Sequence, residues 1–497
     1  MSRVFISILY AIATVLAAPA TASAGRPLHT AIVESSPAIT GSTAGVTLER
    51  MRRNAGADHV NLWVKWSYVA PTPPAGNHAD PRSYTDWRWN ALDRQVTLAR
   101  AHGLEPIVTI RFAPMWAQGD PASPRGNVRP DPVELGLFAR AAATRYSGDF
   151  RVNPADKPLP RVRNWSVWNE PNLSFFLTPQ FVGTKPFSPG WYRRMLNAFA
   201  AGVHAVRASN VVVAGNTAAF GQAEGPETVR DLQRQAPLAF MRRLLCLSRS
   251  LTPTCADRAH FDVWAHHPYT SGGPTHHASS RDSVSLGDLP AMRRVLAAGV
   301  RSGHVVSARR PVQFWVSEFS WDTKGPDPKG VPLSLHARWV AEALYRAWKA
   351  GVTLFTWFKI RDGAFPSTAY QSGLYFNGRP TTDDDSLDIS RDTPKPSLRA
   401  FRFPFVAFQG RTAVATWGRT PRGVPGTVVI ERRTRAGWKR LGAVRTNDHG
   451  VFAKRFAGSM TGRLRARFGR SKSVGFSLKR PPDRNVFPFG CGGGLPC

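Results

Sequence analysis

Long apolar runs and acidic residues are both scarce in this chain of 497 residues. A membrane-spanning helix needs roughly 20 consecutive apolar residues. The first residues form a shorter run, and no later stretch matches it, so a multi-span membrane protein is excluded. Only 33 Asp and Glu accompany 66 Lys and Arg, which gives a formal net charge of +33. With 42% apolar residues, the chain can still bury a core, so wholesale disorder is excluded as well.

Several common motifs are also missing. No G-x-G-x-x-G follows the first apolar run, and there is no P-loop, H-E-x-x-H or G-x-S-x-G. These absences disfavour a dinucleotide-binding fold, a nucleotide hydrolase, a zinc protease and an α/β-hydrolase. His266, His267, His276 and His277 gather in one region, but their spacing fits no standard metal pattern. We therefore expect neither a metal nor a cofactor.

The N-terminus has the pattern of a secretory signal peptide. Arg3 precedes an apolar run over residues 4–18, and Ala22-Ser23-Ala24 supplies small residues for cleavage after Ala24. The alternative is an N-terminal anchor, for which the run is short. We expect residues 1–24 to be removed and the mature protein to be secreted, extracellular or associated with the cell envelope, without a transmembrane segment.

Export favours oxidation of the four cysteines. They lie as two close pairs, Cys246 with Cys255 and Cys491 with Cys497. Two short-loop disulfides are the simplest arrangement, although four cysteines allow three pairings.

Basic residues concentrate toward the C-terminus. Residues 401–480 hold 19 Lys or Arg and two acidic residues, a net charge of +17. Such a surface attracts polyanions, and for an exported protein these are envelope polymers, anionic lipid head groups or acidic polysaccharides. Specific binding to nucleic acid is not expected. The alternative interpretation is a solvated face with an arginine-biased composition.

Most of the chain alternates apolar runs with amphipathic segments. This alternation is typical of parallel strands covered by helices, and eight repeats predict a closed (β/α)8 TIM barrel over residues 25–405. A doubly wound open sheet is the alternative, although the missing glycine motif disfavours it. The eight runs are residues 28–33, 59–69, 106–112, 164–168, 211–214, 261–265, 312–316 and 352–358.

The character of the chain changes after the eighth repeat. Short strands over residues 427–432, 438–446 and 462–468 are separated by turns rich in Gly and Asn. This pattern predicts a small all-β domain, an Ig-like sandwich, over residues 406–480. Residues 481–497 form a tail that carries Cys491 and Cys497.

Two of the predicted strands end in a glutamate. Residues 168–172 read Trp-Asn-Glu-Pro-Asn after the fourth run, and Ser-Glu-Phe at 317–319 follows the seventh. Functional groups of a (β/α)8 barrel come from the carboxyl ends of its strands, so Glu170 and Glu318 should face each other. Paired carboxylates among aromatic rings are what cleavage of a glycosidic bond requires.

These motifs together resemble the retaining glycoside hydrolases of clan A, with closest similarity to families 5 and 39, which include cellulases and β-xylosidases. The resemblance covers the barrel and not the C-terminal region. It implies that Glu170 is the acid/base and Glu318 the nucleophile of a two-step retaining hydrolysis. It also implies that Asn169 binds the sugar 2-hydroxyl.

Further substrate-binding residues follow from the resemblance or from their position at strand ends. His267-Pro268-Tyr269 matches the His-x-Tyr of the sixth strand, which places Tyr269 near the nucleophile. Trp357 matches the tryptophan that forms the floor of the substrate site. The other candidates are Arg111, as the arginine near the nucleophile, Trp116, in a segment similar to family 39, and Trp66 or Lys65 of the second strand.

The expectation is therefore a secreted glycoside hydrolase that cleaves O-glycosidic bonds of an oligo- or polysaccharide, and we expect these bonds to be β-linked. Two alternatives use the same fold. One is a non-catalytic protein that binds envelope glycans on an inherited barrel. The other is a transglycosylase, which shares the covalent intermediate and differs only in whether sugar or water completes the second step.

Overall fold

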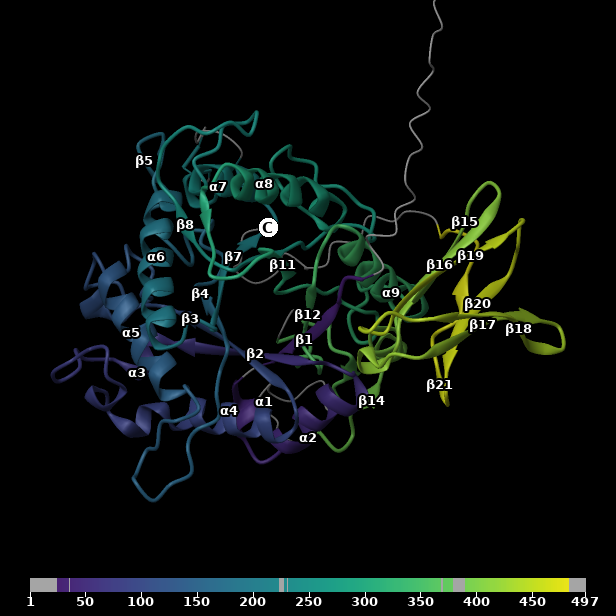
Figure 1. Ribbon diagram of the computed structural model, residues 1–497, viewed down its shortest axis with the longest axis horizontal. Helices are drawn as coiled ribbons and strands as arrows, with labels where there is room; N and C mark the ends of the chain where they lie inside the picture. The colour runs from purple at the N-terminus through teal and green to yellow at the C-terminus, as the bar shows by residue number, and fades with distance from the viewer. Residues whose placement is uncertain are drawn as a thin grey trace, which may run out of the picture.

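A closed barrel of eight parallel strands forms the larger part of the computed structural model (Figure 1). The structure describes residues 25–34, 36–222, 228–229, 231–367, 370–378 and 389–481. The strands follow one another around the barrel in chain order, and β12 closes it by pairing with β1. They are β1 (His29–Val33), β2 (His59–Lys65), β3 (Glu105–Arg111), β4 (Asn164–Val167), β7 (Val211–Ala218), β9 (Val263–His267), β11 (Gln313–Val316) and β12 (Leu354–Phe358).

Side chains alternate across each barrel strand between the interior and the surrounding helices, as the period of two requires. The interior cluster consists of Ala31, Ile107, Val211, Val213, Val263, Ala265, Trp315 and Leu354. Intervening residues, such as Ile32 and Phe355, belong to the much larger cluster between the strands and the helices. The predicted fold class is thus confirmed for the barrel.

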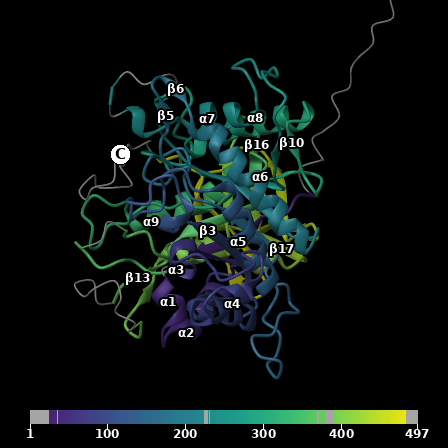
Figure 2. The same ribbon diagram turned by 90° about the vertical axis from the view of Figure 1, so that its left-hand side faces the viewer.

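Helices surround the barrel, and α5 and α6 cross closely on one side of it (Figure 2). A β-carbon on Gly202 would lie 2.2 Å from the backbone oxygen of Gly136, and one on Gly136 would lie 2.8 Å from that of Ala198, so this approach requires glycine at both positions. The longer helices are α4 (Asn90–Ala101), α5 (Pro132–Arg145), α6 (Ser188–Val206), α7 (Pro237–Leu244), α8 (Leu289–Arg301) and α9 (Leu333–Lys349).

Shorter elements fill the connections. The short helices include α1 (Ser36–Thr40), α2 (Ala44–Glu49), α3 (Trp66–Val69) and α10 (Pro396–Arg402). The two-stranded sheets are β5 (Phe181–Val182) with β6 (Lys185–Pro186), β8 (Ala259–His260) with β10 (Val305–Val306), and β13 (Tyr375–Phe376) with β14 (Thr393–Pro394).

The C-terminal region is all-β, as the turn-rich sequence predicts. Figure 1 shows its two sheets to one side of the barrel. The first contains β15 (Phe405–Gln409), β16 (Ala413–Arg419) and β19 (Val451–Ala457). The second contains β18 (Gly437–Arg445), β17 (Thr427–Thr434), β20 (Arg463–Phe468), β21 (Ser471–Lys472) and β22 (Phe476–Ser477).

An aromatic contact and an ion pair join the C-terminal region to the barrel. The Trp417 ring lies 5.4 Å from both the Tyr345 and the Trp348 rings of α9. Arg419 pairs with Asp58 at the start of β2, with 2.7 Å between Nη2 and Oδ2. Burial alone would raise the pKa of Asp58, but the charge of Arg419, the His29 ring and the Thr30 N–H together outweigh it and hold that pKa well below its usual range. The two regions therefore share one continuous apolar core.

The predicted signal peptide and the Cys491–Cys497 tail lie outside the described residues. In the part of the chain that is described, no helix has both the length and the apolarity to cross a bilayer.

Candidate active site

The two glutamates follow β4 and β11, which β7 and β9 separate, and both come at the carboxyl end of the barrel. Glu170 comes three residues after β4, and Glu318 comes two residues after β11. Trp168 and Glu170 have φ values of 66° and 37°, so the turn after β4 is held in a conformation that side chains rarely adopt. Strain of this kind concentrates at functional sites, where the surrounding structure maintains it.

Asn216 of β7 maintains that turn. Its Nδ2 donates to the Ser166 hydroxyl at 2.8 Å and to the Trp168 carbonyl at 3.0 Å. Its own carbonyl accepts the Glu170 N–H at 3.0 Å. Sequence analysis did not find Asn216, because nothing in its local sequence indicates that it reaches across to β4.

His267, at the end of β9, contacts the first glutamate. Its Nδ1 lies 2.9 Å from Glu170 Oε1, and its side chain is only 3% exposed. Burial alone would lower the pKa of His267, but the charges of Glu318 and Glu170 outweigh it, and the pKa lies above its ordinary value. His267 therefore interacts electrostatically with both carboxylates at once.

Tyr269 contacts the second glutamate. Its hydroxyl donates to Glu318 Oε1 at 2.7 Å. Burial raises the pKa of Glu318 and the charge of Glu170 adds to this, whereas His267, the Tyr269 hydroxyl and Arg111 oppose it. The two glutamates thus share one electrostatic environment, in which three donors or cations favour the ionised form of Glu318.

Arg111, the last residue of β3, completes this group. Its guanidinium lies over the Trp63 ring, 4.2 Å from the centroid. Burial lowers the pKa of Arg111 to about 10, against the opposing charges of Glu318 and Glu170. Sequence analysis missed Trp63, although the alternation of side chains along β2 places it on the same face as Lys65.

Phe358 and Tyr370 extend the aromatic wall from Trp63. The Phe358 ring lies 6.3 Å from Trp63 and 5.0 Å from Tyr370. Burial raises the pKa of Tyr370, and the charges of Glu318 and Glu170 contribute, so this ring lies near both carboxylates. These rings offer apolar faces of the kind that bind the C–H face of a sugar.

The expected role of Trp357 requires correction. Along β12, Phe358 points into the barrel, so the intervening Trp357 points outward to the helices. Trp357 is completely buried there, and its ring contacts His336 of α9 and Phe401 of α10. It supports the barrel wall and does not form the floor of the site.

Two further tryptophans lie away from the carboxylates. Trp66 is completely buried and stacks on Phe138 of α5, so the proposal that it binds substrate is also corrected. Trp116 is partly exposed, donates to the Ala70 carbonyl at 2.9 Å and contacts the His78 ring. No contact of the described residues brings Trp116 to Glu170 or Glu318.

Asn169 and Asn172 flank Glu170 but differ in their surroundings. Asn169 is 7% exposed, and its side chain makes no hydrogen bond among the described residues, which leaves the amide available to a ligand. Asn172 instead donates to the carbonyls of Ala218 and Gln235 and accepts the Ala218 N–H. Asn172 therefore anchors the loop to β7.

The histidine cluster is not a metal site in the part of the chain that is described. His266 Nδ1 bonds with the Thr217 hydroxyl at 2.8 Å, and its Nε2 bonds with the Val284 carbonyl at 2.9 Å. Burial lowers the pKa of His266 to about 3, so it is a neutral structural residue. His277 pairs with Asp288 on the surface instead.

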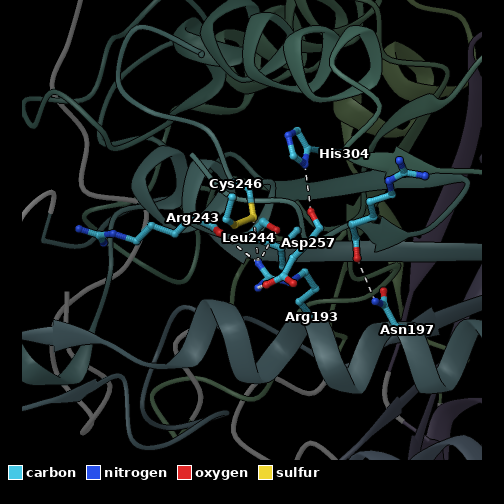
Figure 3. The surroundings of a disulfide bond; sticks show 9 residues. Arg193, Asn197, Arg243, Leu244, Cys246, Asp257 and His304 are labelled. Carbon is cyan, nitrogen blue, oxygen red and sulfur yellow. Dashed lines mark hydrogen bonds and ion pairs between the residues drawn. A yellow bond between two sulfur atoms is a disulfide. The ribbon is translucent and has the colours of Figure 1, made fainter. Parts of the chain in front are cut away.

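A disulfide lies outside the barrel, beside α6 (Figure 3). It joins Cys246 to Cys255, one of the two short-loop pairs that the spacing favours. Arg193 donates to the Leu244 carbonyl at 3.0 Å and pairs with Asp257. Asp257 lies close to both sulfur atoms, but the disulfide leaves no thiolate to bind a metal there.

Comparison with solved structures shows similarity over most of the chain. A family 39 glycoside hydrolase from the gut symbiont Bacteroides cellulosilyticus WH2 matches 88% of this chain and 82% of its own, with a TM-score of 0.51 and 14% identity. The chain has the fold of a family 39 glycoside hydrolase. An enzyme of family 39 from Xanthomonas axonopodis pv. citri covers 88% of this chain and 94% of its own, with a TM-score of 0.49 and 15% identity.

A family 39 β-xylosidase from Caulobacter crescentus covers 82% of this chain and 83% of its own, at 16% identity and a TM-score of 0.48. No protein-family model matches the sequence, and no curated protein matches it. At such identities the similarity establishes the fold, and the chemistry has to be argued from the residues at the barrel mouth.

Proposed function

We propose that this protein is an exported glycoside hydrolase that cleaves β-linked glycosides with retention of configuration. One observation carries the proposal: two carboxylates occupy the same barrel mouth, Glu170 bonded to His267 and Glu318 bonded to Tyr269. A signal-like N-terminus, Arg3 before an apolar run, supports export.

In the first step, Glu318 attacks the anomeric carbon and forms a glycosyl ester, while the glycosidic bond breaks. Glu170 passes a proton to the departing oxygen. The bond from His267 engages Glu170 Oε1, which leaves Oε2 to carry that proton. The Tyr269 bond holds Glu318 Oε1, so Oε2 is the oxygen available for attack.

In the second step, Glu170 takes a proton from water, and the resulting hydroxide displaces Glu318 from the anomeric carbon. The second displacement restores the original configuration. Arg111 and His267 place positive charge beside Glu318, which favours its departure as a carboxylate. Asn169, whose amide has no hydrogen bond among the described residues, is placed to bind a sugar hydroxyl.

The decisive experiment measures sugar release from aryl β-glycosides and soluble β-glycans by the mature protein and by Glu318→Gln. Loss of the nucleophile should lower kcat by about 10⁴-fold or more. Glu105→Gln is the matched control, because Glu105 begins β3 at the opposite end of the barrel and pairs with Arg100. Equal activity of Glu318→Gln and the unaltered protein would refute the assignment.

The stereochemical outcome is tested separately. Proton NMR of the first product formed should show the β-anomer, followed by slow mutarotation to the mixture. Initial appearance of the α-anomer would contradict a covalent intermediate on Glu318, because a single displacement inverts the configuration.

A further inference from the structure

The outer face of the five-stranded sheet carries a row of basic side chains. Along β20, Arg463, Arg465 and Arg467 alternate with the buried Leu464 and Ala466, so the arginines point away from the core. Cross-strand neighbours lie on the same face of a sheet. The register pairs Glu431 with both Arg465 and Arg440, and Arg467 with Lys472. We call these five basic residues, with Glu431, the arginine face.

Glu431 is the one acidic residue of the strands β17, β18 and β20, and it orients two of the arginines. Arg465 Nε donates to Glu431 Oε2 at 2.7 Å, and Arg467 Nε donates to Oε1 at 2.8 Å. Burial alone would raise the pKa of Glu431, but its bonds with Arg467 and Arg465 outweigh it and lower that pKa. Glu431 is therefore a carboxylate that holds both side chains.

This arrangement leaves the outer edges of both guanidinium groups available. The Nη groups of Arg465 and Arg467 have no partner among the described residues, since only Nε is engaged. Residues two apart on a strand are separated by roughly 7 Å. The Nη donors of Arg465 and Arg467 therefore face outward at that spacing along β20. Arg465 is held from a second side, because its guanidinium lies 4.2 Å from the Trp438 ring centroid.

We propose that the arginine face binds an acidic polysaccharide, whose carboxylates pair with the Nη donors of Arg465 and Arg467. Planar arginine forks match carboxylates with two parallel hydrogen bonds. The choice of a glycan rests on the proposed function, whereas the site itself does not. The binding surface would keep the barrel close to a charged polymer.

Two other polyanions fit this face less well. Membrane binding adds insertion of apolar side chains to charge attraction. None of the exposed large apolar residues lies on β17, β18 or β20 of the described chain. Single-stranded nucleic acid needs open aromatic faces for stacking bases. Trp438, which lies beside the arginine face, is instead covered by Arg465 and lies against Gly475.

The role of Glu431 separates an oriented site from general charge attraction. Glu431→Gln makes the protein more positive by one charge, so charge attraction alone predicts tighter binding. The oriented site predicts the reverse, because the loss of the carboxylate frees both guanidinium groups. We expect binding to weaken about threefold to tenfold for Glu431→Gln.

The experiment measures the Kd of the full chain for polygalacturonate at 0.15 M salt, in a Glu318→Gln background so that no polymer is cleaved. Arg465→Gln with Arg467→Gln should weaken binding by about tenfold or more. The matched control is Arg411→Gln with Arg455→Gln, which removes the same charge from the β15–β16 turn and from β19 and should weaken binding less than about threefold. Both arginines of this control are exposed.

Equal effects of the two double variants would overturn the proposal, and so would tighter binding by Glu431→Gln. Stronger binding to phosphatidylglycerol vesicles or to single-stranded DNA than to polygalacturonate would overturn the choice of ligand. Restoring Glu318 in each variant and measuring kcat on a small aryl glycoside checks the fold, since unchanged kcat shows an intact barrel. Failure of polymer binding with Glu318-dependent activity intact would refute this proposal alone.

Discussion

The barrel mouth and the arginine face each place an arginine on a tryptophan beside a glutamate. The guanidinium carbon lies 4.2 Å from the ring centroid in both, Arg111 over Trp63 and Arg465 over Trp438. Yet the pKa of Glu318 is raised, by burial first, and the pKa of Glu431 is lowered by its two arginine bonds. The same residue types therefore give opposite behaviour.

Burial raises the pKa of both glutamates and is outweighed only at Glu431. Differences in neighbouring charge and in hydrogen bonding explain this. Glu318 shares its site with a second carboxylate, Glu170, and receives a neutral hydroxyl bond from Tyr269. Glu431 receives direct bonds from two guanidinium groups. A bond from a cation stabilises a carboxylate more than one from a neutral donor. Glu431 is therefore held in its ionised form, whereas Glu318 remains a reactive carboxylate.

The largest expected effect is on catalysis, which depends on the barrel mouth and not on the arginine face. Glu170→Gln should lower kcat/KM for an alkyl β-glycoside by about 10³-fold or more, because its leaving oxygen needs a proton. A dinitrophenyl glycoside has a leaving group that departs without one, so its glycosylation step should change far less. Glu431→Gln should change kcat/KM for either substrate by less than about twofold. Equal losses for both substrates in Glu170→Gln would argue against the acid role.

The arginines themselves give the next comparison. Arg111→Gln should lower kcat/KM by about 10²-fold, since its charge favours the ionised form of Glu318. Its loss raises the Glu318 pKa further, so the acidic limb of the pH–rate profile should move to higher pH. Arg465→Gln should change neither the rate nor the profile. An unshifted acidic limb in Arg111→Gln would show that the arginine acts on binding alone.

Asn216 positions Glu170 through the backbone, whereas Glu431 positions its two arginines through their side chains. Asn216→Ala removes both Nδ2 bonds to the turn and should lower kcat by about tenfold with little change in KM. Asn216→Gly tolerates the φ of 48° without strain, so a similar loss there would assign the effect to the hydrogen bonds. Full activity in Asn216→Gly would assign it to the backbone conformation.

The smallest effect concerns stability, with opposite signs in the two regions. A raised pKa means that ionisation of Glu318 costs stability as pH rises through the folded value, so Glu318→Gln should stabilise the fold by about 1 kcal/mol at pH 8. A lowered pKa means that Glu431 contributes stability above about pH 4.3, so Glu431→Gln should destabilise by about 1 kcal/mol there.

Urea unfolding at pH 8 and near pH 4 measures both changes. The difference in free energy of unfolding between each variant and the unaltered protein should shrink at the lower pH, where the glutamates of the unfolded chain are largely protonated. Destabilisation by Glu318→Gln at pH 8 would mean that its Tyr269 bond outweighs the cost of burial.

Much of the site could be predicted because its residues end strands of a repeating unit. Glu170 and Glu318 follow apolar runs, and parallel strands bring their carboxyl ends to the same mouth. The resemblance to clan A indicated Arg111, His267 and Tyr269, which lie around the two carboxylates. Trp357 was wrongly assigned because a shift of one residue along a strand reverses the side on which a side chain lies.

Local periodicity and composition were enough to predict the alternating elements, the all-β C-terminal region and the charged residues at strand ends. The bonds by which Asn216 holds the Glu170 turn and Glu431 aligns two arginines became apparent in the folded structure alone. Those contacts join strands far apart in the chain. They exist only once the barrel closes and the sheet adopts its register, and local sequence carries no record of either.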